Sequence, residues 1–299
     1  MMDIAVFADI HGNHSALQAC IDYTMERGIT NFILLGDYVS DCPYPQKTME
    51  LVYVLKQYFN TCIIRGNREE YLLNYKKRGG EGWKAGSSSG SLLYTYNNLT
   101  DKDFDFFSSL QNQGIYEMPG MPKFQYCHGS PENTSEVLIR EKRNTKRILA
   151  HMNTSLLLHG HVHIQDAYVY RGKKAVGPGS IGIPWFHGGK TQFCILHGNG
   201  KTWEEELIQL EYNRKEILKE FKESGLSNIA PAWAALAMHT IRTGVDLSET
   251  VLLRAMRLCE QERGAVKWPD IPEKYWAIAL KENYIDLAGK EIPHKTNSN

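Results

Sequence analysis

Apolar runs and segments of helical spacing alternate through the first third of the chain. Three short apolar runs end in polar side chains, as buried strands do; they cover residues 3–9, 31–37 and 61–67. The segments between them place apolar side chains three or four positions apart, as in helices that cover a sheet; they cover residues 15–28, 44–58 and 68–77. This alternation predicts a mainly parallel sheet with helices packed outside it.

The middle of the chain is less regular. Residues 78–91 are rich in glycine and serine and predict a flexible loop, and residues 99–110 predict a short helix. Closely spaced strands, some of them antiparallel, are then expected at residues 123–129, 154–160, 166–170, 173–180, 191–198 and 202–212.

The pattern changes after Tyr212, where only helices are expected. Four segments carry helix start or stop signals; they cover residues 214–225, 231–244, 248–264 and 272–284. We therefore divide the chain into a domain at residues 1–212 and a helical C-terminal appendage at residues 213–299. The helices have apolar faces and no flexible linker precedes them, so we expect the appendage to dock on the first domain or on a second subunit.

Composition removes several classes of protein. The chain carries 34 Lys and Arg against 34 Asp and Glu, so its net charge gives no argument for nucleic acid or an acidic membrane surface as a partner. No apolar run approaches the ~18 residues of a spanning helix, and the N-terminus lacks the features of a signal peptide. Six scattered cysteines without a C-x-x-C pair predict reduced thiols and a cytoplasmic protein.

Polar residues follow the predicted strands at the point where each strand ends. They are Asp9, His11, Asp37, Asn67, His128, His161 and His163. Ligands bind beyond the carboxyl ends of strands in such sheets, and imidazole, carboxylate and amide groups together suit two divalent ions. Asp37 follows the central strand and is the natural bridge between the ions. Two divalent ions would outweigh the charges of Asp9 and Asp37, so the site would attract an anionic phosphate.

The order of these motifs resembles a known family. D-x-H, GD, GN, a lone H and GHxH, in that order, resemble the calcineurin-like metallophosphoesterase superfamily over roughly residues 1–210. Within residues 1–210, three segments look most like the bacterial branch of this superfamily that is related to diadenosine tetraphosphatases and small phosphodiesterases. They are FADIHGNHSALQA, LLGDYVSDCPYP and AVGPGSIGIP. The resemblance implies an α/β fold of four layers, an α/β/β/α sandwich in which helices flank two sheets.

The resemblance also implies a ligand set and a reaction. One ion would take Asp9, His11, Asp37 and His163, and the other would take Asp37, Asn67, His128 and His161. Manganese is the first candidate, with iron, zinc, nickel or cobalt as alternatives. The implied reaction is hydrolysis of a small phosphodiester, pyrophosphate or phosphomonoester by a metal-bridging hydroxide. The residues implied in catalysis are Asp37, Asn67, Arg68 and His128.

The chain departs from the family pattern at Arg68, where many members carry a histidine after Gly-Asn. Arginine stays charged and cannot act as a general acid, but it can clamp phosphate oxygens. The alternative is an ion pair with a neighbouring glutamate. We expect substrate contacts from Asn67, Arg68 and His187, whereas His159 matches no family ligand.

Two other functions stay open. A Ser/Thr protein phosphatase would use the same chemistry, although Ser40-Asp41 stands where such phosphatases carry an aspartate–arginine pair. A non-catalytic scaffold would be expected to lose ligands, whereas every ligand position is filled here. The expected partner is a small phosphorylated substrate, with nucleotides among the candidates. Neither a membrane nor nucleic acid is indicated, and a homo-oligomer is left open.

Overall fold

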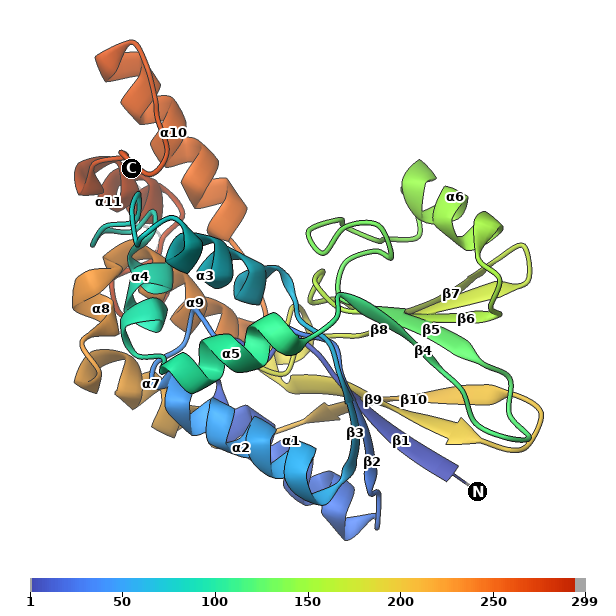
Figure 1. Cartoon of the computed structure of the whole chain (residues 1–299). Coiled ribbons are helices and arrows are strands. Elements are labelled where there is room, and N and C mark those ends of the chain that lie inside the picture. The colour runs from blue at the N-terminus through green and yellow to red at the C-terminus, as the bar shows by residue number, and fades with distance from the viewer. Residues whose placement is uncertain (1, 294–299) are drawn as a thin grey trace.

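Two five-stranded sheets lie face to face in the computed structural model, which describes residues 2–293 (Figure 1). The first sheet has the order β10-β9-β1-β2-β3, with β1 at Met2–Phe7, β2 at Asn31–Leu34, β3 at Asn60–Ile63, β9 at Thr191–Gly198 and β10 at Trp203–Leu210. The second has the order β4-β5-β6-β8-β7, with β4 at Gln113–Tyr116, β5 at Phe124–Cys127, β6 at Leu156–His159, β7 at Gln165–Tyr170 and β8 at Lys173–Pro178. All the predicted strands are present, and β4 is an additional one.

Helices cover the outer faces of both sheets. Three pack on the first sheet and one on the second: α1 (His14–Glu26), α2 (Pro45–Tyr58) and α5 (Asp101–Ser109), and then α6 (Arg143–His151). Alternation along β1 sends Phe7 toward the helices, and it sends Ile4 and Val6 into the core between the sheets. These layers form the α/β/β/α sandwich that the resemblance implies.

Parallel pairing gathers the carboxyl ends of several strands. β1 pairs in parallel with β2, and β2 with β3; in the other sheet β5 pairs in parallel with β6, and β6 with β8. The backbone N–H of Gly160, after β6, donates to the carbonyl oxygen of His128, after β5, at 2.7 Å. The segments that leave these strand ends carry the polar residues of the predicted site.

The C-terminal helices pack against residues 1–212, as expected from their apolar faces. They are α7 (Arg214–Glu223), α8 (Leu226–Ile229), α9 (Pro231–Thr243), α10 (Ser248–Arg263) and α11 (Glu273–Glu282). Cys42 and Ile183 share one buried apolar cluster with Phe221 of α7. Glu220 accepts a hydrogen bond from His14 Nε2 at 2.7 Å, which ties α7 to α1. The domain boundary at residue 212 stays a prediction, and residues 294–299 of the predicted appendage lie outside the described residues.

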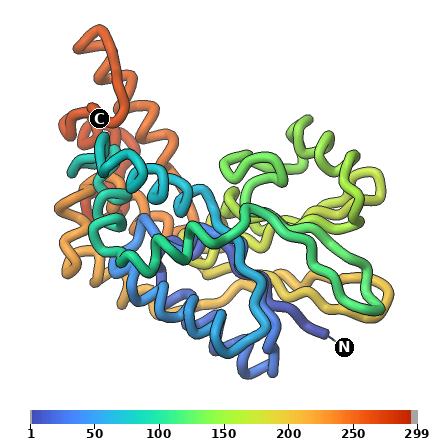
Figure 2. Tube along the Cα trace, viewed as in Figure 1, coloured from blue at the N-terminus to red at the C-terminus, as the bar shows by residue number. Residues whose placement is uncertain are grey.

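The segment at residues 78–91 differs from the flexible loop that its composition predicts. It follows α3 (Asn67–Lys77), and its last residues begin α4 (Gly90–Asn97). The backbone N–H of Gly86 donates to the carbonyl oxygen of Ile229 at 2.7 Å, and that of Ser87 donates to the Glu273 carboxylate at 2.6 Å. These bonds hold the segment beside the C-terminal helices, as Figure 2 shows in cyan next to orange and red. Three helices, α4, α6 and α8, lie outside the helical segments that the sequence predicts. Among the described residues, every helix is too short or too polar to cross a lipid bilayer.

Candidate metal centre

The backbone is unusual at the predicted ligands. Five of them are non-glycine residues with left-handed backbone angles: φ is 54° at Asp9, 50° at His11, 54° at Asp37, 70° at His161 and 55° at His163. Such angles are uncommon outside glycine, and each costs free energy that the surrounding structure must offset. Their concentration at one end of the sheets supports a functional role for this place.

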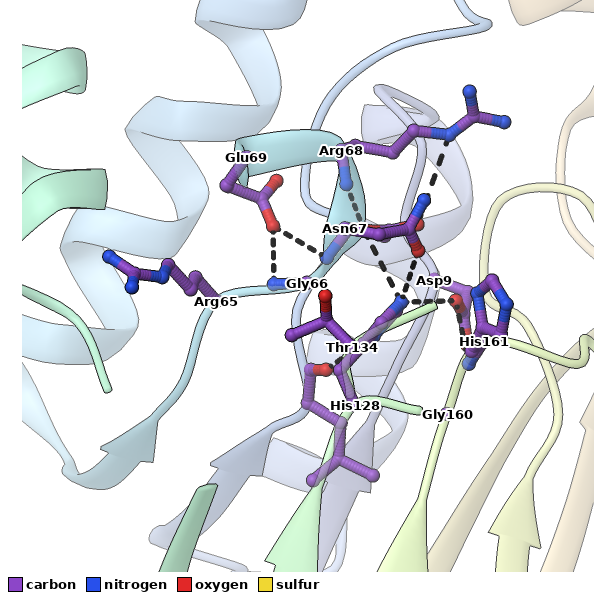
Figure 3. A network of polar contacts seen from close by, with 12 residues as sticks. Asp9, Arg65, Gly66, Asn67, Arg68, Glu69, His128, Thr134, Gly160 and His161 are labelled. Atoms are coloured by element: carbon purple, nitrogen blue, oxygen red, sulfur yellow. Dashed lines mark hydrogen bonds and ion pairs between the residues drawn. The ribbon is translucent and has the colours of Figure 1, made fainter. Parts of the chain in front are cut away.

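Contacts with the backbone hold the loops that follow β1, β2 and β3 close to one another. The N–H of His11 donates to the carbonyl oxygen of Asp37 at 2.9 Å, which joins the ends of β1 and β2. Gly66 passes so close to the Asp37 carboxylate that a Cβ atom there would collide with it. The carboxylate of Glu69 accepts from the N–H groups of Gly66 at 2.8 Å and Asp37 at 2.9 Å (Figure 3). Glu69 is therefore a buried positioning residue that the sequence did not single out.

The predicted ligands meet in two groups. Asp9, His11 and His163 form one, and Asp37, His128 and His161 form the other. Within each group, one nitrogen or oxygen from every residue lies within 4.8 Å of the others. Asn67 joins the second group, because its Oδ1 lies 2.9 Å from Nε2 of His128 (Figure 3). The two groups contain the same residues as the two implied ligand sets, except that Asp37 falls in the second group only.

Hydrogen bonds fix how two of the imidazoles face the site. Nδ1 of His128 donates to the carbonyl oxygen of Leu35 at 2.8 Å, and Nδ1 of His163 donates to that of Ile183 at 3.0 Å. With Nδ1 engaged in this way, Nε2 of each ring faces its ligand group and can act as a metal ligand once it is deprotonated. Nε2 of His163 lies 2.9 Å from Nε2 of His11. The lone pairs of two unprotonated nitrogens at this distance repel each other unless a proton or a metal cation lies between them. The donor set therefore fits a metal ion.

The carboxylates and imidazoles perturb one another. Burial raises the pKa of Asp9 above its ordinary value, and the neighbouring charge of Asp37 adds to this. Burial would also raise the pKa of Asp37, but His128 and His11 hold it below its ordinary value. Burial would lower the pKa of His128, yet the charges of Asp37 and Asp9 raise it to about 9. Two buried carboxylates that need compensating positive charge are a suitable environment for divalent cations.

Asp41 is a second residue that sequence reasoning missed. Its carboxylate lies 3.0 Å from the guanidinium of Arg68 and 3.1 Å from Nδ1 of His11. It also accepts a hydrogen bond at 2.7 Å from Nε1 of Trp233, a residue of α9. Arg68 therefore pairs with an aspartate, not with the neighbouring glutamate considered above. Asp41 was noted only as evidence against a protein phosphatase, and no motif marked it as the link between His11 and Arg68.

A cavity of about 190 Å³ opens over the two ligand groups. Six of the predicted site residues line it: His11, Asp37, Asn67, Arg68, His161 and His163. The C-terminal helices and the loop after α9 contribute Trp233, Leu236, Ala237, Thr240, Asp246 and Ser248. Those residues could not be assigned from the sequence, because docking alone brings them to the site.

His187 and His159, which the sequence analysis names, lie outside this cavity. His187 is exposed in the short 3-10 helix η1 (His187–Gly189), and within residues 2–293 it is not among the cavity-lining side chains. Its position therefore gives no support to a substrate contact. His159 is buried in β6 beside Tyr168, with the ring centroids 6.3 Å apart. Its Nε2 has no hydrogen-bond partner among the described residues.

Comparison with known proteins gives a consistent family. Residues 2–201 match the calcineurin-like phosphoesterase superfamily domain. An uncharacterized protein of Methanocaldococcus jannaschii is 24% identical over 249 residues, which are 77% of this chain and 94% of that protein. The crystal structure of a hypothetical protein from Pyrococcus horikoshii has a similar fold, with a TM-score of 0.69 and 22% identity. A metallophosphoesterase from Sphaerobacter thermophilus gives 0.63 and 20%, and each structure covers 82% of this chain and is itself covered completely.

The match to the superfamily domain spans most of the chain, and it covers every strand end at which the ligand groups form. Membership implies divalent metal ions, and the two ligand groups are candidates for holding them. The chain belongs to the calcineurin-like phosphoesterase superfamily and is a metal-dependent phosphoesterase.

Proposed function

We propose that the chain uses two divalent ions to hydrolyse a small phosphodiester, pyrophosphate or phosphomonoester. The observation that carries this proposal is the pair of ligand groups described above, which lie side by side at the strand ends. Such ions supply, when bound, a water of lowered pKa and positive charge for the phosphate oxygens. Manganese is the first candidate, and iron, zinc, nickel or cobalt are alternatives.

The position of Asp37 supports a role for it in both groups. Its Oδ1 lies 3.4 Å from Nε2 of His128, and its Oδ2 lies 3.7 Å from Nε2 of His11. One carboxylate oxygen thus faces each ligand group, and a carboxylate in this position can bridge two ions. We assign Asp37 as the bridge, and we assign Asn67 and His128 as ligands on one side of it.

The surroundings of Arg68 support a contact between its guanidinium and the phosphate. Its guanidinium pairs with Asp41 at 3.0 Å, and its backbone N–H donates to Oδ1 of Asp37 at 2.8 Å. Its Nε has no hydrogen-bond partner among the described residues, although its side chain is only 20% exposed. Arg68 therefore keeps donors for phosphate oxygens. Since arginine cannot protonate a leaving group, the site should favour leaving groups that are stable as anions.

The size of the cavity supports a small substrate. Trp233 and Leu236 of α9 cover one side of it, and Asp246 follows in the next loop. A folded phosphoprotein would have to displace these helices to reach the ligand groups. The protein-phosphatase alternative is therefore the weaker proposal.

A substrate panel tests the proposal. The chain would be loaded in turn with manganese, iron, zinc, nickel and cobalt and offered a phosphodiester, pyrophosphate, a phosphomonoester and a phosphopeptide. We expect hydrolysis of a small substrate, and a loss of at least about 100-fold in His161→Ala, since even an outer partner of a ligand is worth about 10- to 100-fold. His151→Ala, at an exposed histidine of α6, is the matched control and should retain activity. No hydrolysis with any ion, or equal activity in His161→Ala, would contradict the proposal.

A further inference from the structure

A second and larger cavity adjoins the metal centre. Its volume is about 1040 Å³, and it shares Asp41, Arg68 and Trp233 with the smaller cavity. The shared residues include the arginine that we assign to the phosphate. A molecule whose phosphate lies against Arg68 can therefore place its remaining atoms in the larger cavity.

The walls of this cavity come from both parts of the chain. α3 contributes Tyr71 and Tyr75, which lie four positions apart and so share one face of the helix, and Arg78 follows its last residue. The C-terminal region contributes Trp268, from the loop before α11, and Trp276 of α11. Because Trp233, Leu252 and Trp276 belong to the C-terminal helices, the cavity forms only when these helices are docked.

Aromatic rings form much of the lining. Trp83 stacks on Tyr75 with the ring centroids 4.0 Å apart and 6° between the planes. Trp268 also lines the cavity, and 47% of its surface is exposed. Rings of this kind offer flat apolar faces on which a planar group can stack, and they do so with little regard to its substituents.

Three buried polar atoms in the wall lack a hydrogen-bond partner among the described residues: Nε of Arg68, Oγ of Ser88 and Nε1 of Trp276. Trp276 is fully buried and lines the cavity, and its Nε1 has no hydrogen-bond partner among the described residues. Buried donors are nearly always satisfied in folded proteins, and this one is an exception. Since 0% of its surface is exposed, Trp276 shapes the wall of the cavity and offers no donor that a ligand can reach.

Charge in the cavity is compatible with an anionic ligand. Asp41 and Asp270 are already paired, with Arg68 and Lys84 respectively. Arg78 and Lys267 also line the cavity, and neither forms a salt bridge with any residue in the range 2–293. Glu81 is the remaining carboxylate of the lining, so the unpaired cations outnumber it.

We propose that this cavity binds the base of a nucleotide whose phosphate lies at the metal centre. This inference rests on the proposed function, which supplies the position of the phosphate. The volume decides between a base with its sugar and a single phenyl ring, because ligand sites of about 300–1000 Å³ hold molecules much larger than a phenyl group. The substrate class is thus a phosphoester of a nucleoside, with the base stacked among the tryptophans.

The test measures binding and does not require turnover. Adenosine, ribose and phenol would be titrated calorimetrically into the full chain after its metals have been removed with a chelator. We expect adenosine to bind about 5- to 100-fold more tightly than ribose, as one base stacked on aromatic side chains would give. Trp268→Ala should remove most of this preference. Tyr58→Ala, at a tyrosine of α2 that is 69% exposed, is the matched control and should retain it.

Three results would overturn the subsite: equal binding of adenosine and ribose, an unchanged preference in Trp268→Ala, or phenol binding as tightly as adenosine. If circular dichroism shows that Trp268→Ala is unfolded, Trp83→Leu replaces it with the same expected result. Failure of the proposed function is a separate outcome. A chain that hydrolyses the substrate panel without a preference for adenosine lacks the base subsite only. A chain that prefers adenosine but hydrolyses nothing contradicts the hydrolytic assignment only.

Discussion

Asp41→Asn should disturb the chain more than the exchange of one oxygen for an NH₂ group suggests. Oδ1 of Asp41 accepts from Nε1 of Trp233 at 2.7 Å and from Oγ of Ser91 at 3.3 Å. Oδ2 faces the guanidinium of Arg68 at 3.0 Å and Nδ1 of His11 at 3.1 Å. An amide has one oxygen and one NH₂ group. In one orientation the NH₂ group would face the donors of Trp233 and Ser91, and in the other it would face those of Arg68 and His11.

The magnitude follows from the burial of these contacts. A hydrogen bond to a charged group contributes about 1.5–3 kcal/mol, and the substitution removes two of them in either orientation. Water cannot replace them, because Asp41 is only 3% exposed. Arg68 would keep Asp37 as its other acidic neighbour, at 3.9 Å, which reduces the loss. We expect the free energy of unfolding to fall by about 3–5 kcal/mol, as for other broken buried ion pairs.

Urea unfolding at neutral pH, in the presence of a chelator, measures this loss. The matched control is Asp166→Asn, which breaks an exposed pair between Asp166 and Arg140 at 2.6 Å. That pair should contribute no more than about 1 kcal/mol, since exposed ion pairs are weak. Metal affinity should also fall about 10- to 100-fold in Asp41→Asn, because His11 loses its carboxylate partner. A stability equal to that of Asp166→Asn would refute the reasoning.

Three further predictions address other parts of the molecule. Arg68→His should narrow the difference in hydrolysis rate between good and poor leaving groups, because imidazole can donate a proton. The control is Arg65→His, at an arginine two residues before Asn67, and an equal narrowing there would contradict the role of position 68. Truncation after Tyr212 should lower the melting temperature and leave metal binding intact, because Cys42 and Ile183 lose their cover; an unchanged melting curve would be the contrary result. Burial would lower the pKa of His197, but Asp3 and Glu206 raise it above its ordinary value. The imidazolium therefore stabilises the fold fully below about pH 6.5, and this contribution is lost as the pH rises through the raised pKa. His197 is partly exposed, so urea unfolding should show less than about 1 kcal/mol between wild type and His197→Gln near pH 6, shrinking toward pH 9; a gap that grows with pH would reverse the sign.

The fold could be predicted to a large extent because its signals are local. Each parallel strand is a short apolar run, and each run ends in polar residues that belong to a recognisable motif. Asp9 and Asp37 could be paired in advance, because parallel neighbours in a sheet place their carboxyl ends together. The segment at residues 78–91 could not, because its hydrogen bonds to Ile229 and Glu273 come from helices far along the chain.

The outer parts of the site escaped prediction for the same reason. Asp41 looks like any loop aspartate in the sequence, and its role appears only when Arg68, His11 and Trp233 surround it. No motif marks Glu69 in the sequence, and its role appears only because its carboxylate accepts backbone N–H groups of Gly66, Asp37 and Tyr38. Sequence motifs thus identify the residues that would bind metal and substrate. The residues that position them can be identified only from tertiary contacts.

Metal content tests the central proposal most directly. Wild type, Asp37→Ala and the exposed-site control Asp22→Ala would be dialysed against manganese, and the bound ions would be counted per chain by mass spectrometry. Because Asp37 directs one carboxylate oxygen toward each ligand group, we expect two ions in wild type and in the control. Asp37→Ala should lose both ions together, along with phosphoester hydrolysis. One fully occupied ion in Asp37→Ala, or a wild-type chain that binds no more than one, would contradict the bridged two-metal centre.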